Sequence, residues 1–201
     1  MRRFAVLLFC LLLAACSMAG KRGGDTAMAT YDLGPRAELR AGTLRPTPMA
    51  LEVRAPLWFD SMGINYRLAY AEPARLREYS RARWAGPPAQ LIQQRLVRDL
   101  ALVPAGQSQA ACLLRLDIDE FSQVFASSAA SSAVLQGRVQ WLDRGRNRLA
   151  ERLVNIEKPA ASSDSAGGVQ AMTAALAELS SRLQTWENEL RVSGQLRPCQ
   201  P

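Results

Sequence analysis

The chain of 201 residues contains no histidine. A Ser-His-Asp triad and every histidine-based metal site are therefore excluded. The sequence also has no Gly-x-Ser-x-Gly nucleophile motif and no glycine-rich loop of the kind that binds phosphate groups. A hydrolase would need a mechanism without histidine, so we predict that the protein is not an enzyme and has no cofactor.

Carboxylates provide the remaining candidate metal ligands. Asp117, Asp119 and Glu120 form the best cluster. Because strand residues two apart share a face, Asp117 and Asp119 could form a small calcium site. A solvated strand face explains the same pattern, and we predict no metal site.

Long apolar runs are also missing, except at the N-terminus. Residues 4–15 are apolar and follow Arg2 and Arg3, which is the pattern of an export signal. The run of about twelve residues is shorter than the twenty or so that a membrane span needs. It ends in Leu13-Ala14-Ala15-Cys16, which resembles a bacterial lipobox. We predict that residues 1–15 are removed and that Cys16 is lipidated; an ordinary secretory peptide and a membrane-spanning anchor are the alternatives.

Residues 16–30 show no apolar period and contain three glycines, which predicts a flexible tether. Fully extended, it would hold the domain up to about 45 Å from the lipid. In lipoprotein sorting, an aspartate directly after the cysteine retains a protein in the inner membrane, whereas Ser17 stands here. We therefore expect a lipid-anchored protein on the periplasmic face of the outer membrane of a Gram-negative bacterium.

Two cysteines remain in the mature domain. Cys10 leaves with the signal and Cys16 is lipidated, so Cys112 and Cys199 are left. Two unpaired thiols are uncommon in an oxidising periplasm, which favours a disulfide between them. The alternative is a buried free thiol at Cys112 and a frayed chain end at Cys199.

The net charge is +7, and arginine supplies nearly all of the positive charge. Such a surplus attracts the phosphate groups of lipids or nucleic acids, but export argues against nucleic acid as a partner. A GC-rich genome also produces arginine-rich proteins. The most basic stretch predicts either solvated helix faces or a site for anionic headgroups or an acidic partner. Its arginines are Arg75, Arg77, Arg81, Arg83, Arg95 and Arg98.

Residues 31–201 are long enough for one domain with a real core. Alternating apolar residues predict strands over residues 49–55, 66–70, 114–121, 135–141 and 149–156, with a short edge strand at 31–33. We expect the strands at 49–55 and 66–70 to pair as a hairpin. The alternation slips at Glu120, which indicates a bulge that returns Phe121 to the core.

Helical spacing appears in three segments. Residues 74–83 are expected to form a polar helical piece, and a second helix begins at Pro87-Pro88 and ends near Leu102. The last helix, capped by Asp164 or Ser165, has the clearest pattern, and packing across a sheet is favoured over a coiled-coil partner. Its stripe comprises Val169, Met172, Leu176, Leu179, Leu183, Trp186 and Leu190. The elements together predict an α+β fold, with a mostly antiparallel sheet and two main helices packed on one face.

Several short motifs resemble, in their order along the chain, the ABC-type transport auxiliary lipoproteins. After the lipobox the motifs are, in order, Tyr31-Asp32-Leu33-Gly34-Pro35, residues 53–58, residues 66–70, residues 73–76, Arg83-Trp84-Ala85 with Pro87-Pro88, Asp119-Glu120-Phe121, and the closing helix with Trp186. The resemblance implies a periplasmic accessory of the paraquat-inducible protein C type. Such lipoproteins work beside mammalian-cell-entry (MCE) proteins in moving lipids between the two membranes, and they carry no catalytic motif.

The leading hypothesis is therefore a noncatalytic adaptor, anchored by Cys16, that docks on an MCE-family periplasmic protein and can form a homo-oligomer around it. The second is a structural or assembly lipoprotein for lipopolysaccharide export or a secretion machine, which shares every feature except the family resemblance. The third is a periplasmic hydrolase that works without histidine.

Overall fold

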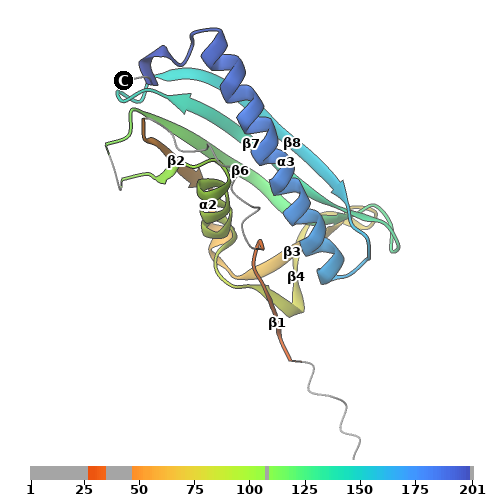
Figure 1. Cartoon of the computed structure of the whole chain (residues 1–201). Coiled ribbons are helices and arrows are strands. Elements are labelled where there is room, and N and C mark those ends of the chain that lie inside the picture. Colours follow the sequence, from red (N-terminus) through yellow and green to blue (C-terminus); the bar gives the residue numbers. More distant parts are fainter. Residues whose placement is uncertain (1–26, 35–46, 107–108, 200–201) are drawn as a thin grey trace, which may run out of the picture.

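In the part of the chain that the structure describes, one mixed sheet of eight strands carries two helices on one of its faces (Figure 1). The structure is a computed structural model, and it describes residues 27–34, 47–106 and 109–199. The expected signal peptide and Cys16 lie outside the described residues. The elements are β1 Ala29–Tyr31, β2 Met49–Arg54, η2 Leu57–Asp60, β3 Gly63–Leu68, β4 Glu72–Trp84, α2 Pro88–Asp99, β5 Val103–Pro104, β6 Cys112–Phe125, β7 Ser131–Leu142, β8 Arg148–Pro159, α3 Ser165–Val192 and η3 Arg197–Cys199.

Strand β6 organises the sheet. One of its edges pairs with β7 over almost its whole length, and β7 pairs in turn with β8, both antiparallel. The other edge takes β2 at its start and β3 at its end, both parallel. The predicted α+β class is confirmed. The edge strand predicted at residues 31–33 is β1, which is parallel to β4 but spans Ala29–Tyr31, so the prediction placed it about two residues too late.

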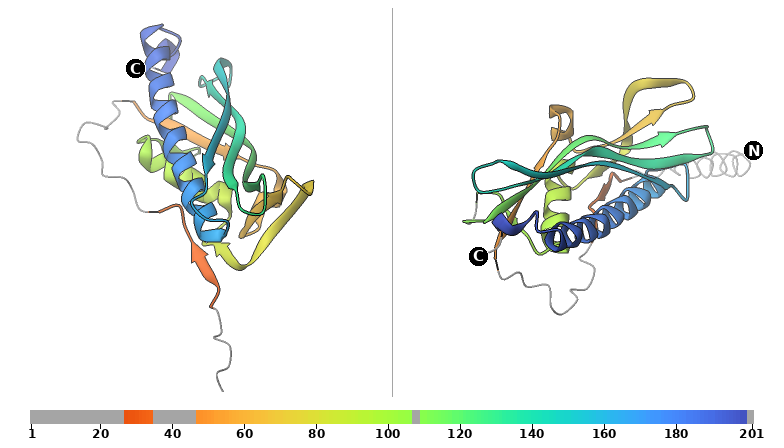
Figure 2. Two further views of the ribbon diagram at one scale, coloured as in Figure 1. Left: turned by 90° about the vertical axis from the view of Figure 1, so that its right-hand side faces the viewer. Right: turned by 90° about the horizontal axis from the view of Figure 1, so that it is seen from above.

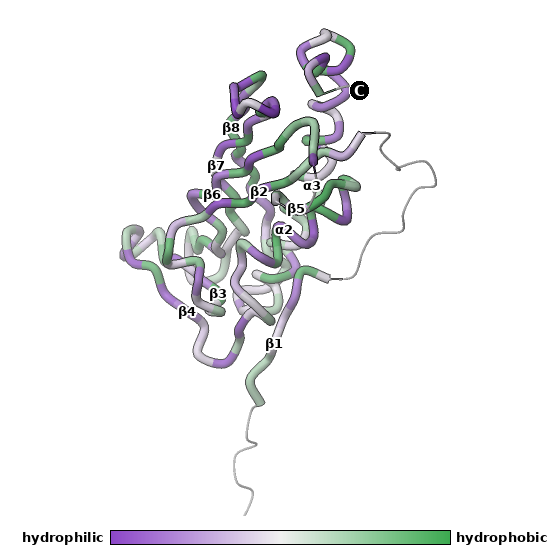
Figure 3. Tube along the Cα trace, turned by 90° about the vertical axis from the view of Figure 1, so that its left-hand side faces the viewer, coloured by the Kyte–Doolittle hydropathy of each residue, from purple (hydrophilic) through white to green (hydrophobic). Residues whose placement is uncertain are grey.

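Strands β6, β7 and β8, where strands were predicted at 114–121, 135–141 and 149–156, form an antiparallel meander with polar and apolar residues alternating along each strand (Figure 3). The pairing of β6 with β7 shifts register between Ile118 and Glu120, where the sequence indicated a bulge. The extra residue, Asp119, lets Phe121 turn back into the core, where it is buried.

Both main helices cover the same face of the sheet (Figures 1 and 2). All seven residues of the predicted stripe on α3 are buried against the sheet. The Asp164 carboxylate caps α3 by accepting a hydrogen bond of 2.8 Å from the Gly167 N–H. The helix ends before Gly194, whose φ of +78° favours glycine.

A buried ion pair ties α2 to its neighbours. The Arg95 Nε lies 2.7 Å from Asp99 Oδ2, and Arg95 Nη1 donates to the backbone oxygen of Leu33, beyond the end of β1. The Ser180 hydroxyl of α3 donates to the same Asp99 oxygen at 3.2 Å. Three segments that are distant in the sequence thus share one charged cluster.

The helix predicted over residues 74–83 is wrong, because this segment belongs to β4. The Tyr79 hydroxyl donates to Gln123 Oε1 of β6 at 2.8 Å, and the Tyr79 ring lies 4.7 Å from that of Tyr66 on β3. The predicted helix had only two large apolar residues, Leu76 and Tyr79, so pairing with β3 outweighs its weak helical periodicity.

The predicted hairpin of the strands at 49–55 and 66–70 is also wrong. Strand β2 pairs with the start of β6, for example Leu51 with Leu114, and β3 pairs with β4 and with the end of β6. The two strands therefore lie one after the other along the same edge of β6, separated by η2. Because β6 is 14 residues long, it accommodates both.

We predict that Gly137→Ala lowers the free energy of unfolding by about 1–3 kcal/mol, as overpacking does. Gly137 lies opposite Ile118 at the bulge, and a Cβ there would lie 2.2 Å from the backbone oxygen of Asp117. Urea unfolding followed by circular dichroism measures the change. The matched control is Gly86→Ala, where the nearest atom to a Cβ is 3.8 Å away and little change is expected. Equal unfolding midpoints for the two variants would contradict the prediction.

Candidate functional site

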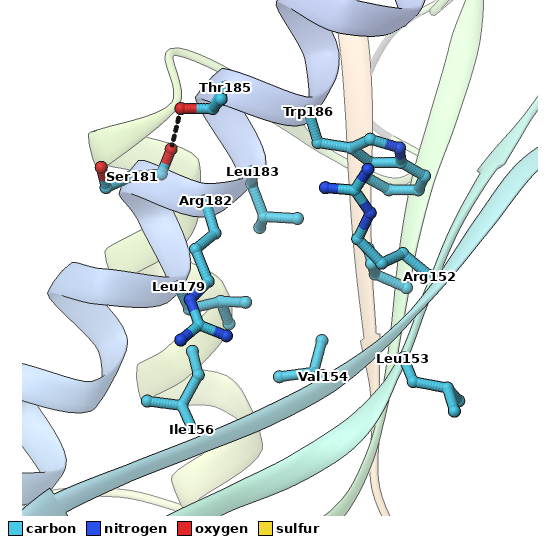
Figure 4. A pocket seen from close by; sticks show the side chains of 11 residues that line it. Arg152, Leu153, Val154, Ile156, Leu179, Ser181, Arg182, Leu183, Thr185 and Trp186 are labelled. Carbon is cyan, nitrogen blue, oxygen red and sulfur yellow. Dashed lines mark hydrogen bonds between the residues drawn. The ribbon is translucent and has the colours of Figure 1, made fainter.

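A groove lies between α3 and β8 (Figure 4), with a volume of about 260 Å³. Its floor is apolar, and two arginines stand over it, one from each wall. The lining residues are Val139, Arg152, Leu153, Val154, Ile156, Leu179, Ser181, Arg182, Leu183, Thr185 and Trp186.

Arg152 covers one end of the groove. Its guanidinium carbon lies 5.2 Å from the centre of the Trp186 ring, a cation–π contact, and its Nη2 lies 3.0 Å from Glu189 Oε2. Both charged side chains of this pair are about half exposed, so the pair adds little to stability. The guanidinium can exchange Glu189 for another anion at small cost.

Arg182 covers the other end. Its Nη1 donates to the Asn155 backbone oxygen at 3.3 Å, and it pairs with Glu178. Glu178 also pairs with Lys158 of β8. The hydrogen bond from Lys158 is the main cause that holds the pKa of the Glu178 carboxyl below its usual value, and Arg182 adds to it.

These charged side chains protect an edge of the sheet. In the part of the chain that the structure describes, β8 pairs with β7 alone, so its other edge faces no strand. Among the groove side chains, the Thr185 hydroxyl bonds to its own helix, to the Ser181 backbone oxygen at 3.1 Å. The groove combines an apolar floor with cationic rims, which suits binding of an apolar group with an anionic end.

The sheet face opposite α3 is charged. Glu52 on β2 lies 2.9 Å from guanidinium nitrogens of both Arg54 and Arg115 and 3.7 Å from Arg146. Burial disfavours the ionised form of Glu52, but hydrogen bonds from Arg115 and Arg54 outweigh it and hold the pKa of this carboxyl below its usual value. This face has the character of a solvated surface.

The structure joins Cys112 and Cys199 in a disulfide, with their Cα atoms 5.2 Å apart. Cys112 begins β6, and Cys199 lies in η3 after α3. Both residues are buried. The bridge therefore fastens the end of the chain to the first residue of the central strand. Cys16, the expected lipidation site, lies outside the described residues.

The carboxylates considered for calcium are separated by the bulge. Asp119 occupies the bulge and is exposed, while Glu120 pairs with Arg67 at 3.0 Å. Within residues 27–34, 47–106 and 109–199, no three His, Cys, Asp or Glu side chains gather as metal ligands.

The basic stretch does not form two helix faces. Arg75, Arg77, Arg81 and Arg83 lie on β4, and the first two pair with Glu72. Arg95 is buried in its pair with Asp99. The interpretation as solvated helix faces is therefore wrong for the four strand residues.

No pattern in the sequence indicated the groove. Arg152, Arg182 and Trp186 come from a strand and a helix, and only the packing of α3 over β8 brings them together. Of these three residues, only Trp186 belongs to the predicted core stripe, which also contains Leu179 and Leu183 of the groove floor. None of the helices in the described part of the chain is long and apolar enough to cross a membrane.

These observations define a class of protein: an α+β domain with one helix-covered and one charged sheet face. The sequence model of the ABC-type transport auxiliary lipoprotein component family matches residues 31–184. The chain belongs to this family, as its short motifs indicated. Membership makes it an auxiliary component of a transport system.

Two solved structures share the fold. The crystal structure of protein XCC0632 from Xanthomonas campestris, assigned to the family DUF330, has a TM-score of 0.67 at 22% identity and covers 84% of this chain and 98% of its own. The crystal structure of an uncharacterized protein has a TM-score of 0.62 at 16% identity and covers 78% of this chain and 96% of its own. The comparison with curated proteins gave no match.

We predict that the protein isolated without reductant has no reactive thiol in the mature domain. Replacing both Cys112 and Cys199 by serine should lower the free energy of unfolding by about 4–5 kcal/mol, because a bridge across 87 residues restricts the unfolded chain. Thiol titration of the denatured protein and urea unfolding measure the two effects. Two reactive thiols per unreduced chain would refute the bridge.

Proposed function

We propose that the protein is anchored through Cys16 to the periplasmic face of the outer membrane. There it serves as a noncatalytic accessory of an ABC transport system that moves lipids between the two membranes together with an MCE-family protein. The observation that carries this proposal is the family match over residues 31–184, in a chain whose Leu13–Cys16 stretch resembles a lipobox.

The described domain supports a binding role. Its most buried charged pair, Arg95 with Asp99, holds α2 against its neighbours and is enclosed by protein. The groove beside β8 is lined by apolar and cationic side chains, with no nucleophile bonded to a general base. An accessory that binds a partner needs such surfaces and no reacting groups.

We predict that the mature protein begins with an acylated Cys16 and fractionates with the outer membrane. The variant Cys16→Ala should lose the acyl mass and its outer-membrane fractionation while the domain keeps its fold, since Cys16 lies outside the domain. Mass spectrometry of the N-terminus and membrane fractionation measure these outcomes, and far-UV circular dichroism checks the fold. An unmodified N-terminus, or a wild-type protein found wholly in the soluble periplasmic fraction, would contradict the anchor.

We also predict that the tagged lipoprotein, extracted in mild detergent, co-purifies with an MCE-family protein. The matched control is the Cys16→Ala variant expressed at the same level. If the MCE-family protein binds the folded domain, this variant should also co-purify with it, because loss of the anchor leaves the domain unchanged. Recovery of an outer-membrane barrel in place of the MCE protein would assign the protein to assembly of the outer membrane.

A further inference from the structure

An apolar patch projects from the connection between β2 and β3. Leu57 is 84% exposed, Trp58 52% and Met62 44%. We call these three residues the η2 patch. Three large apolar side chains exposed within the segment 57–62 make it a candidate contact site, because exposing them to water contributes nothing to folding.

The η2 patch is held in place by the core. Phe59, between the exposed residues, is 2% exposed, and its N–H donates to the Pro56 oxygen at 2.9 Å. The Trp84 N–H donates to the Met62 oxygen at 2.7 Å. The side chains of the patch are therefore presented by a fixed backbone.

The strand register places the η2 patch near the point where the chain leaves toward Cys16. Arg83 of β4 pairs with Thr30 of β1 on one side and with Gly63, next to Met62, on the other. Two strand spacings put Thr30 and Gly63 about 10 Å apart. Cys16 precedes Ala27 by eleven residues, which span at most about 40 Å. A bilayer that holds an acylated Cys16 is thus within reach of the patch.

The chemistry of the η2 patch fits the boundary between headgroups and acyl chains. Tryptophan concentrates at this boundary because its ring is apolar and its N–H is polar. Arg81 and Arg83 on β4 are exposed, and guanidinium groups bind phosphate. Asp60 and Glu78 lie in the same region and offset part of this charge. Any attraction of this region to a bilayer would therefore come from insertion of its apolar side chains more than from its net charge.

We infer that the η2 patch rests on the phospholipid bilayer that holds the lipid anchor; the inference rests on the anchor proposed above. The segment that carries η2 lies on the far side of the sheet from α3 (Figure 2, right). Contact through the patch therefore turns α3 and its groove away from the membrane, toward the periplasm. The anchor fixes the protein to the bilayer, and the patch sets its orientation.

Tryptophan fluorescence tests the contact directly. The chain has four tryptophans, and Trp84, Trp141 and Trp186 are all buried, so Trp58 alone is accessible to lipid. The mature lipoprotein is reconstituted into vesicles of phosphatidylethanolamine and phosphatidylglycerol with brominated acyl chains, which quench tryptophan on contact. We expect a shift to shorter wavelength in plain vesicles and a partial loss of emission in brominated ones. The variant Trp58→Phe should abolish both effects.

The control variants test whether the quenching depends on the η2 patch or on any exposed apolar side chain. Leu57→Asn combined with Met62→Asn keeps Trp58 but should remove the quenching. Val192→Asn, at a valine in the last turn of α3 that is 90% exposed and lies outside both the η2 patch and the groove lining, should leave it unchanged. Full emission from Trp58 in protein that floats with the vesicles overturns the inference and leaves the anchor intact. Emission that changes only when a purified transport partner is added also overturns it. Protein that does not float overturns the anchor and the inference together.

Discussion

Burial of the α3 stripe against the sheet is the interaction on which the structure depends. The helix crosses β7 and β8 and covers side chains such as Val139 and Ile156, which would otherwise face water. Its C-terminal end is fastened a second time, because η3 follows it and Cys199 is bonded to Cys112 at the start of β6. Apolar contact along the helix and one covalent bond at its end therefore fix the same arrangement.

This arrangement leaves two exposed features at the periphery, the groove beside β8 and the η2 patch. The charged network around Glu52 keeps one sheet face solvated, while α3 and α2 close the other. The groove beside β8 and the η2 patch remain, and they lie on different sides of the sheet.

Patterns that depend on one element alone were read correctly from the sequence. The stripe on α3 and the bulge between Ile118 and Glu120 follow from the spacing of a few residues, and the cap, predicted at Asp164 or Ser165, is Asp164. The helix predicted over residues 74–83 failed because Tyr79 bonds to Gln123 on another strand. The predicted hairpin failed for a similar reason: β6 offers a single edge long enough for both β2 and β3.

The sequence by itself determined the family, the α+β class and the absence of histidine chemistry, since these follow from residue identity and order. Tertiary structure alone decided the neighbours of each strand, the meeting of Arg152, Arg182 and Trp186 in one groove, and the exposure of Leu57 and Trp58. The physical reason is that periodicity records which side of an element is apolar. It does not record which other element covers that side, or whether any element does.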